Sequence, residues 1–117
     1  MNTFNTEYIQ VVTTTNTREL AVKIAETVVK KKLGACGQIS GPITSIYEWK
    51  NNIESSEEFY CTIKTRAELF EKVENCIKSL HPYEVPEIIA TPIINGSKDY
   101  LDWINEITRG DTPIILN

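Results

Sequence analysis

Hydrophobic and polar residues alternate with a period of two in three separate stretches of the chain, and a fourth stretch is a short apolar run with a late proline, which together predict four β-strands. β-Branched and aromatic residues, which favour strands, are frequent in these stretches. The predicted strands cover residues 8–15, 36–49, 57–64 and 88–94. Gly41-Pro42 interrupts the second stretch and predicts a bulge or a sheet edge there. Asn51-Asn52 predicts a hairpin turn before the third strand, because asparagine tolerates positive φ.

Between these strands, apolar residues recur at the spacing of amphipathic helices. Asn16 and Thr65 each stand three residues before a glutamate, a pattern that predicts capped helix starts. Ser97 is a third candidate cap, and Gly34 is suited to end the first helix. The predicted helices lie between positions 16 and 34, over residues 68–80 and from about position 97 to position 107.

The resulting order of elements, β-α-β-β-α-β with an additional C-terminal helix, is the ferredoxin-like split βαβ pattern. We therefore predict an α+β fold in which two helices lie on one face of a four-stranded antiparallel sheet. The 117 residues are enough for one domain, so residues 1–117 are expected to form a single unit.

The predicted hairpin is long for such a small sheet, and its far end carries Tyr47, Trp49 and Ile53. Two helices are too few to cover these side chains, which favours pairing of strands between subunits. The C-terminal run Ile114-Ile115-Leu116 is also apolar, and we expect it to pack on a neighbouring subunit.

Composition excludes some classes of partner. The net charge of −4 argues against general binding to nucleic acid or to anionic membranes, which depends on excess basic residues. No apolar run is long enough for a membrane span, and the N-terminal residues lack the pattern of a signal peptide. The three cysteines are not spaced like a metal ribbon or a redox pair. These features predict a cytoplasmic protein with reduced thiols.

Candidate chemistry concentrates in residues 81–87, which contain the only histidine, two prolines, a tyrosine and two glutamates. The prolines make this segment stiff and extended. The simpler interpretation is a connector in which His81 caps the preceding helix. A second interpretation makes His81 and Glu84 an acid–base pair. Because no activated nucleophile or phosphate-binding loop accompanies them, we expect no enzymatic activity.

Five runs of residues, in this order and spacing, resemble the CutA family of divalent-cation-tolerance proteins. They are residues 32–36 (KLGAC), 45–49 (SIYEW), 64–65 (KT), 81–88 (HPYEVPEI) and 100–104 (YLDWI). The resemblance covers roughly residues 8–108. It implies a ferredoxin-like homotrimer in which long hairpin strands join neighbouring subunits, with an architecture like that of the PII nitrogen-signalling regulators. It also implies a link to metal tolerance, copper above all, and no established catalytic activity.

In some members of that family, copper binding is attributed to a cysteine and to histidines beside the Pro-Tyr pair. Carried over to this sequence, the metal ligands would be Cys36 and His81. Some members have a second histidine where this chain has Leu80. Copper(II) prefers nitrogen and copper(I) prefers sulfur, so a tight site needs a further ligand from Glu84, Glu87 or another subunit. No cofactor is otherwise required. Without a metal, Cys36 would be a packed residue at a strand entry.

The alternative function is a PII-like sensor of a small molecule or anion, with a cleft between subunits. Aromatic rings beside a lysine and carboxylates would suit a small polar ligand. The candidate cleft residues are Tyr47, Trp49, Lys64, His81, Tyr83 and Glu84. Tyr47 and Trp49 could equally anchor a subunit interface.

Overall fold

The structure is a computed structural model that describes residues 7–109. Its elements are β1 (Tyr8–Thr15), α1 (Arg18–Lys30), β2 (Cys36–Trp49), β3 (Asn52–Arg66), a 3₁₀ turn (Ala67–Leu69), α2 (Phe70–Leu80), β4 (Ile88–Pro92) and α3 (Lys98–Ile107). This order confirms the predicted α+β split βαβ pattern with its additional C-terminal helix. The apolar run at positions 114–116, for which we predicted packing on a neighbour, lies outside the described residues.

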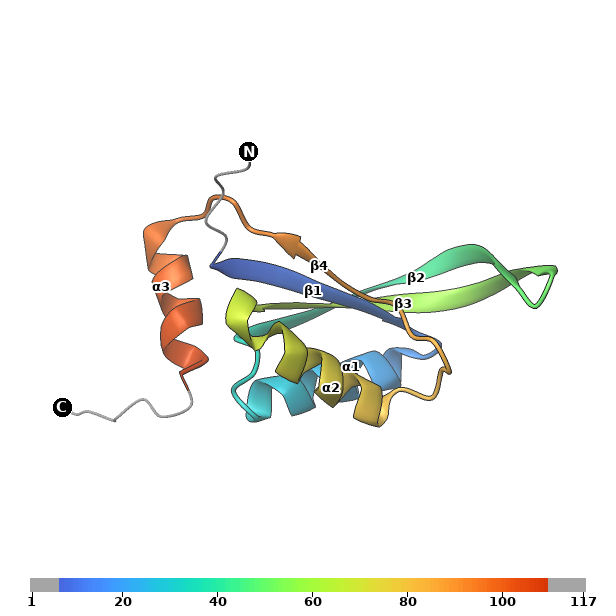
Figure 1. The fold of residues 1–117 in the computed structure, drawn as a ribbon, viewed down its shortest axis with the longest axis horizontal. Coiled ribbons are helices and arrows are strands. Elements are labelled where there is room, and N and C mark those ends of the chain that lie inside the picture. The colour runs from blue at the N-terminus through green and yellow to red at the C-terminus, as the bar shows by residue number, and fades with distance from the viewer. Residues whose placement is uncertain (1–6, 110–117) are drawn as a thin grey trace.

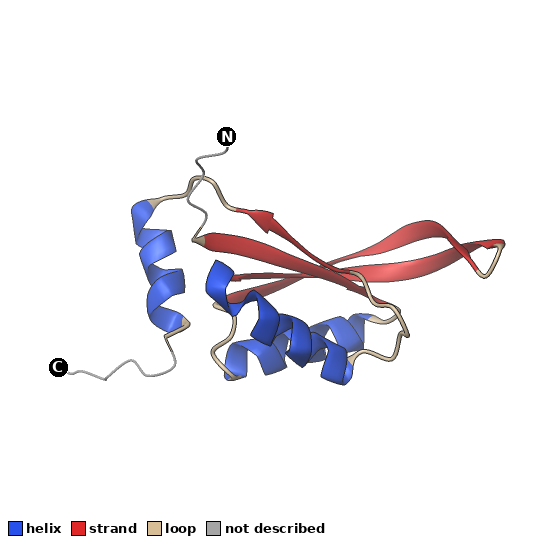
Figure 2. Ribbon diagram, in the orientation of Figure 1, coloured by secondary structure: helices blue, strands red, loops and turns tan. Residues whose placement is uncertain are grey.

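The four strands form one sheet in the order β2-β3-β1-β4, and every neighbouring pair is antiparallel. Helices α1 and α2 lie side by side against one face of this sheet (Figures 1 and 2). The alternation of β1 and β3 turns one set of side chains toward the helices. The core between the layers consists of Ile9, Val11, Ala21, Ile24, Ala25, Val28, Cys61, Ile63, Val73, Cys76 and Ile77.

Helix α3 lies away from this two-helix layer, at the end of the sheet where β1 begins (Figure 1). Arg66, the last residue of β3, connects the sheet to the end of this helix. Its Nε atom donates a hydrogen bond to Thr108 Oγ1 at 2.8 Å, and its Nη2 atom donates one to Thr108 O at 2.9 Å. One guanidinium fork therefore holds both oxygen atoms of Thr108, a residue that is 2% exposed.

Strands β2 and β3 extend beyond the rest of the sheet as a long arm (Figure 2). Trp49 pairs with Asn52, so the turn consists of Lys50 and Asn51, whose φ angles are 53° and 70°. Positive φ at both central residues is the geometry of a type I′ hairpin. The turn is thus one position earlier than the predicted Asn51-Asn52, and β3 begins at Asn52 rather than at Glu57.

Local details of the predicted elements also differ. The cap of α1 is Thr17 rather than Asn16, since the Thr17 hydroxyl accepts a hydrogen bond from Leu20 N. Thr65 does not cap α2, because its hydroxyl donates to Leu33 O at 2.6 Å instead. Ser97 caps α3 as predicted. The predicted bulge is present as a register shift between Ser40 and Ile43.

Candidate functional site

The loop that follows α2 crosses the end of β1, and His81 fixes it there. The ring of His81 is buried, with its Nε2 atom 2.7 Å from Thr14 O and its Nδ1 atom accepting the Tyr83 backbone N–H at 3.2 Å. Because Nδ1 is the acceptor, Nε2 carries the proton and donates to Thr14. Both ring nitrogens therefore serve to position the loop.

Tyr83 continues this network toward the hairpin. Its ring packs edge-on against His81, with centroids 4.5 Å apart, and its hydroxyl donates to Glu58 Oε2 at 2.8 Å. Burial raises the pKa of Tyr83 above its ordinary value, and the hydrogen bond to the Glu58 carboxylate adds to the effect. The phenol thus stays protonated and remains a donor to β3.

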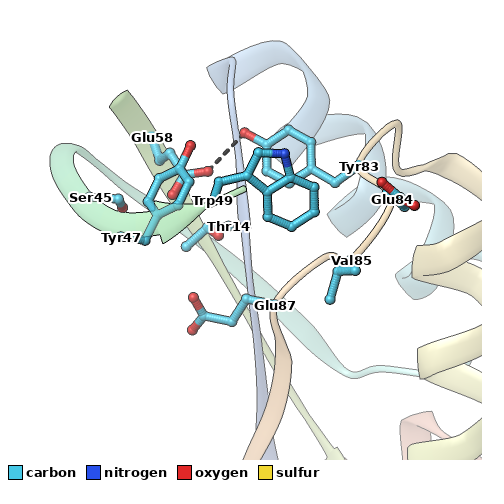
Figure 3. A pocket seen from close by; sticks show the side chains of 9 residues that line it. All are labelled: Thr14, Ser45, Tyr47, Trp49, Glu58, Tyr83, Glu84, Val85 and Glu87. Carbon is cyan, nitrogen blue, oxygen red and sulfur yellow. Dashed lines mark hydrogen bonds between the residues drawn. The ribbon is translucent and has the colours of Figure 1, made fainter. Parts of the chain in front are cut away.

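A cavity of about 450 Å³ lies beside this loop where the hairpin arm leaves the sheet, with Tyr47 and Trp49 lining it from farther out along β2, and we call it the hairpin-foot pocket. Its lining consists of Thr14, Ser45, Tyr47, Trp49, Glu58, Tyr83, Glu84, Val85 and Glu87. Figure 3 shows Tyr47 and Trp49 reaching in from β2, opposite the side chains of the loop, and the hydrogen bond between Tyr83 and Glu58. Every charged side chain of this lining is a carboxylate.

Four of the six predicted cleft residues, Tyr47, Trp49, Tyr83 and Glu84, meet in this pocket. The other two do not line it. His81 supports Tyr83, and the Lys64 ammonium contacts the Gln38 amide oxygen. Lys64 is six residues from Glu58 along β3, which corresponds to about 20 Å of strand. Its positive charge is therefore not part of the pocket.

Sequence reasoning missed five lining residues: Thr14, Ser45, Glu58, Val85 and Glu87. Glu58 is the most informative of them, since it is 6% exposed although glutamate ordinarily lies on the surface. Strand alternation puts Glu58 on the face opposite Phe59 and Cys61. What covers it is a loop that lies far away in sequence.

The two predicted copper ligands, Cys36 and His81, lie at opposite ends of β1. Cys36 pairs with Lys64, which in turn pairs with Gln10, whereas His81 binds Thr14. Four residues of strand separate Gln10 from Thr14, or about 14 Å. Within residues 7–109, no three histidine, cysteine, aspartate or glutamate side chains form a group that could hold a metal ion. A copper site that uses both residues would need a second chain.

Comparison with known proteins places this fold and these residues in context. The family model described as "CutA1 divalent ion tolerance protein" matches residues 9–107. The chain is 41% identical over 98 residues to the "Divalent-cation tolerance protein CutA" of Thermus thermophilus, covering 84% of this chain and 95% of that protein. It is 42% identical over 101 residues to "Protein CutA, chloroplastic" of Arabidopsis thaliana, covering 86% of this chain and 56% of the plant protein.

A solved structure supports the same family. The crystal structure of CutA1 from Shewanella sp. SIB1 superposes with a TM-score of 0.86 at 41% identity, covering 89% of this chain and 97% of that one. Similarity in both sequence and structure thus extends over nearly all described residues, including both walls of the pocket. The chain belongs to the CutA1 family of divalent ion tolerance proteins.

Proposed function

We propose that this protein acts in divalent cation tolerance as a non-catalytic sensor that binds a small ligand in the hairpin-foot pocket. The observation that carries this proposal is the convergence of Tyr47, Trp49, Tyr83 and Glu84 on one cavity. Its size is within the usual range for small-molecule sites. Tyr83 is held by His81 and Glu58, so this wall of the pocket is preformed.

A screen of metabolites for an increase in melting temperature tests this site. A true ligand stabilises the folded state by mass action. The increase should disappear in Trp49→Ala and persist in Trp103→Ala, with each variant compared to its own unliganded state. The two tryptophans make a matched pair, because they are 39% and 38% exposed and only Trp49 lines the pocket. A ligand that stabilises both variants equally would contradict the assignment of the pocket.

The proposed assembly is a PII-like homotrimer. Large apolar side chains remain exposed on the arm, with Ile46 at 71% and Ile53 at 74%. Ile46 and Ile53 lie on the face of the hairpin opposite Tyr47 and Trp49, so one face can contact a neighbouring subunit while the other lines the pocket. Sedimentation at micromolar concentration should give a trimer, and a monomer would contradict the proposal.

Direct copper binding is the second candidate, and the half-exposed thiol of Cys36 favours it. Copper(I) prefers such a soft ligand. Calorimetric titration of Cu(I) and Cu(II) should show weaker binding in Cys36→Ser and His81→Gln than in wild type. Cys76→Ala removes a buried thiol and serves as the matched control. Equal affinity in all four proteins would exclude both residues as ligands.

We also propose that the protein works in the cytoplasm. The three cysteines lie within the described residues and form no disulfide there. None of the helices in residues 7–109 has the length and apolarity that crossing a bilayer requires. Alkylation of the thiols at the moment of cell lysis should recover them reduced, and recovery as disulfides would contradict this compartment.

A further inference from the structure

We propose that the hairpin-foot pocket selects an organic cation, an alkylammonium group on a small apolar body. This inference rests on the proposed function, since it names the ligand class of the same pocket. Three features carry it: a buried carboxylate that no basic side chain of residues 7–109 pairs with, a set of aromatic rings around the cavity, and a cavity too large for a bare ion.

The first feature is the charge of the lining. Glu58, Glu84 and Glu87 are carboxylates, and no lysine or arginine of the described residues lines the cavity. Glu58 is 6% exposed, and within residues 7–109 no basic side chain forms an ion pair with it. The hydrogen bond from the neutral Tyr83 hydroxyl satisfies only part of this carboxylate. A buried charge is costly unless it is paired, so a cationic ligand would supply what the chain does not.

The second feature is the aromatic lining. Tyr47, Trp49 and Tyr83 face the cavity from two different elements (Figure 3). Ring faces attract cations, and tryptophan does so most strongly. Trp49 already shows this preference, since Lys50 Nζ lies 5.9 Å from its ring centroid at the turn of the hairpin. Lys50 does not line the pocket, so a cation inside the pocket would share Trp49 with Lys50 and would meet the Tyr47 and Tyr83 rings without a basic side chain in the described lining.

The third feature is size. The cavity of about 450 Å³ has room for a small organic molecule. Glu58 comes from β3, whereas Glu84 and Glu87 come from the loop, and the three carboxylates do not form a three-ligand metal group within the described chain. Val85 adds an apolar contact for the body of such a ligand. An anionic ligand would meet three like charges, and the positive charge that we had predicted for this cleft, Lys64, lies elsewhere on β3.

Three probes of matched shape test the charge preference: n-butylammonium, n-butanol and butyrate. The experiment uses full-length Trp103→Phe protein, in which Trp49 is the single tryptophan, at constant ionic strength. Butylammonium should change the Trp49 fluorescence saturably. Butanol and butyrate should bind at least about tenfold more weakly, as expected for loss of cation–π and charge-assisted contacts.

Two variants locate the binding. Glu58→Gln removes the charge but keeps an acceptor for Tyr83, and it should weaken butylammonium binding by about tenfold. Glu57→Gln makes the same change at the adjacent exposed position of β3 and should leave binding unchanged. Melting temperatures measured without ligand establish that both variants fold.

The failures are distinguishable. Equal binding of all three probes would overturn the charge preference and leave the pocket as a ligand site. Absence of any fluorescence change with butylammonium would overturn the inference, and the metabolite screen would still decide the proposed function independently. Dissociation of the oligomer in Glu58→Gln would also overturn it, because a neighbouring subunit would then provide the cation.

Discussion

The two ends of β1 carry the residues that family resemblance groups into one copper site, and they are built differently. At the His81 end, hydrogen bonds run from Thr14 through His81 to Tyr83 and on to Glu58. This chain joins β1, the loop after α2 and β3. Each of its polar side chains has a partner inside the protein, and the network forms one wall of the pocket.

At the Cys36 end, the candidate ligand is more exposed to solvent than His81 is. Cys36 is half-exposed, and the Tyr100 hydroxyl of α3 lies beside its thiol. Burial raises the pKa of Tyr100 above its ordinary value, and proximity to Cys36 adds to this. Arg66, through its fork to Thr108, holds α3 against this end of the sheet.

This difference shows that residue type alone does not make a metal ligand. The imidazole uses both nitrogens for backbone contacts, so coordination by His81 would have to break one of them. The thiol of Cys36 is instead hydrogen-bonded to a side chain, the Tyr100 hydroxyl. We therefore expect the His81 end to determine stability and the Cys36 end to determine reactivity.

The largest effect is expected from His81→Ala. This substitution removes two hydrogen bonds from a buried position and leaves a cavity under Tyr83, so the free energy of unfolding should fall by about 3 kcal/mol. Urea denaturation measures it. Lys78→Ala, at an exposed position on α2 with an i,i+4 pair to Glu74, is the control and should cost less than about 0.5 kcal/mol. Similar losses in the two variants would mean that His81 is a mere connector.

At the other end of β1, the corresponding test is Arg66→Lys. Lysine keeps the charge but cannot form the fork to Thr108, so the free energy of unfolding should fall by about 1.5 kcal/mol. Urea denaturation again measures the change, and amide hydrogen exchange should increase in α3. Arg18→Lys at the exposed start of α1 is the matched control. Unchanged exchange in α3 would show that the fork does not hold this helix.

The fold could be predicted because each element has a strong local pattern. Alternation in residues 8–15 and helical spacing in residues 68–80 agree with the structure, because burial on one face imposes these periods. The turn was misplaced by one residue, since Lys50, Asn51 and Asn52 are all polar and only the pairing of Trp49 with Asn52 selects between them.

The site could be predicted only in part. Tyr47, Trp49, Tyr83 and Glu84 belong to runs that resemble the family, and they do meet. Glu58 was missed because its burial depends on a loop 25 residues away in sequence. Lys64 was misplaced because same-face residues of a strand look equivalent in sequence, although distance along the strand separates them.

A smaller effect on stability should appear at alkaline pH, where the buried thiol of Cys61 contrasts with the half-exposed thiol of Cys36. Burial raises the pKa of Cys61 from 9.0 to about 12. In the unfolded chain this thiol ionises at its ordinary pKa, so the stability contribution of the buried thiol is complete below pH 9 and is lost as the pH rises from 9 toward 12. At pH 10 this titration should lower the free energy of unfolding by about 1.4 kcal/mol. Urea denaturation should show that the free energy of unfolding falls between pH 8 and pH 10 by this much less in Cys61→Ala than in wild type. Equal falls in the two proteins would contradict the prediction.

The smallest effect on stability is expected from Cys36→Ser, because its thiol is half-exposed and is not among the residues of the apolar core. The free energy of unfolding should change by less than about 0.5 kcal/mol. The same substitution should abolish the rapid thiol reaction of the folded protein. Wild-type protein at neutral pH should show one thiol that reacts rapidly with a disulfide reagent, and Cys36→Ser should show none until it is unfolded. Rapid reaction that survives in Cys36→Ser would place the accessible thiol at Cys61 or Cys76 and would remove the contrast between the two ends of β1.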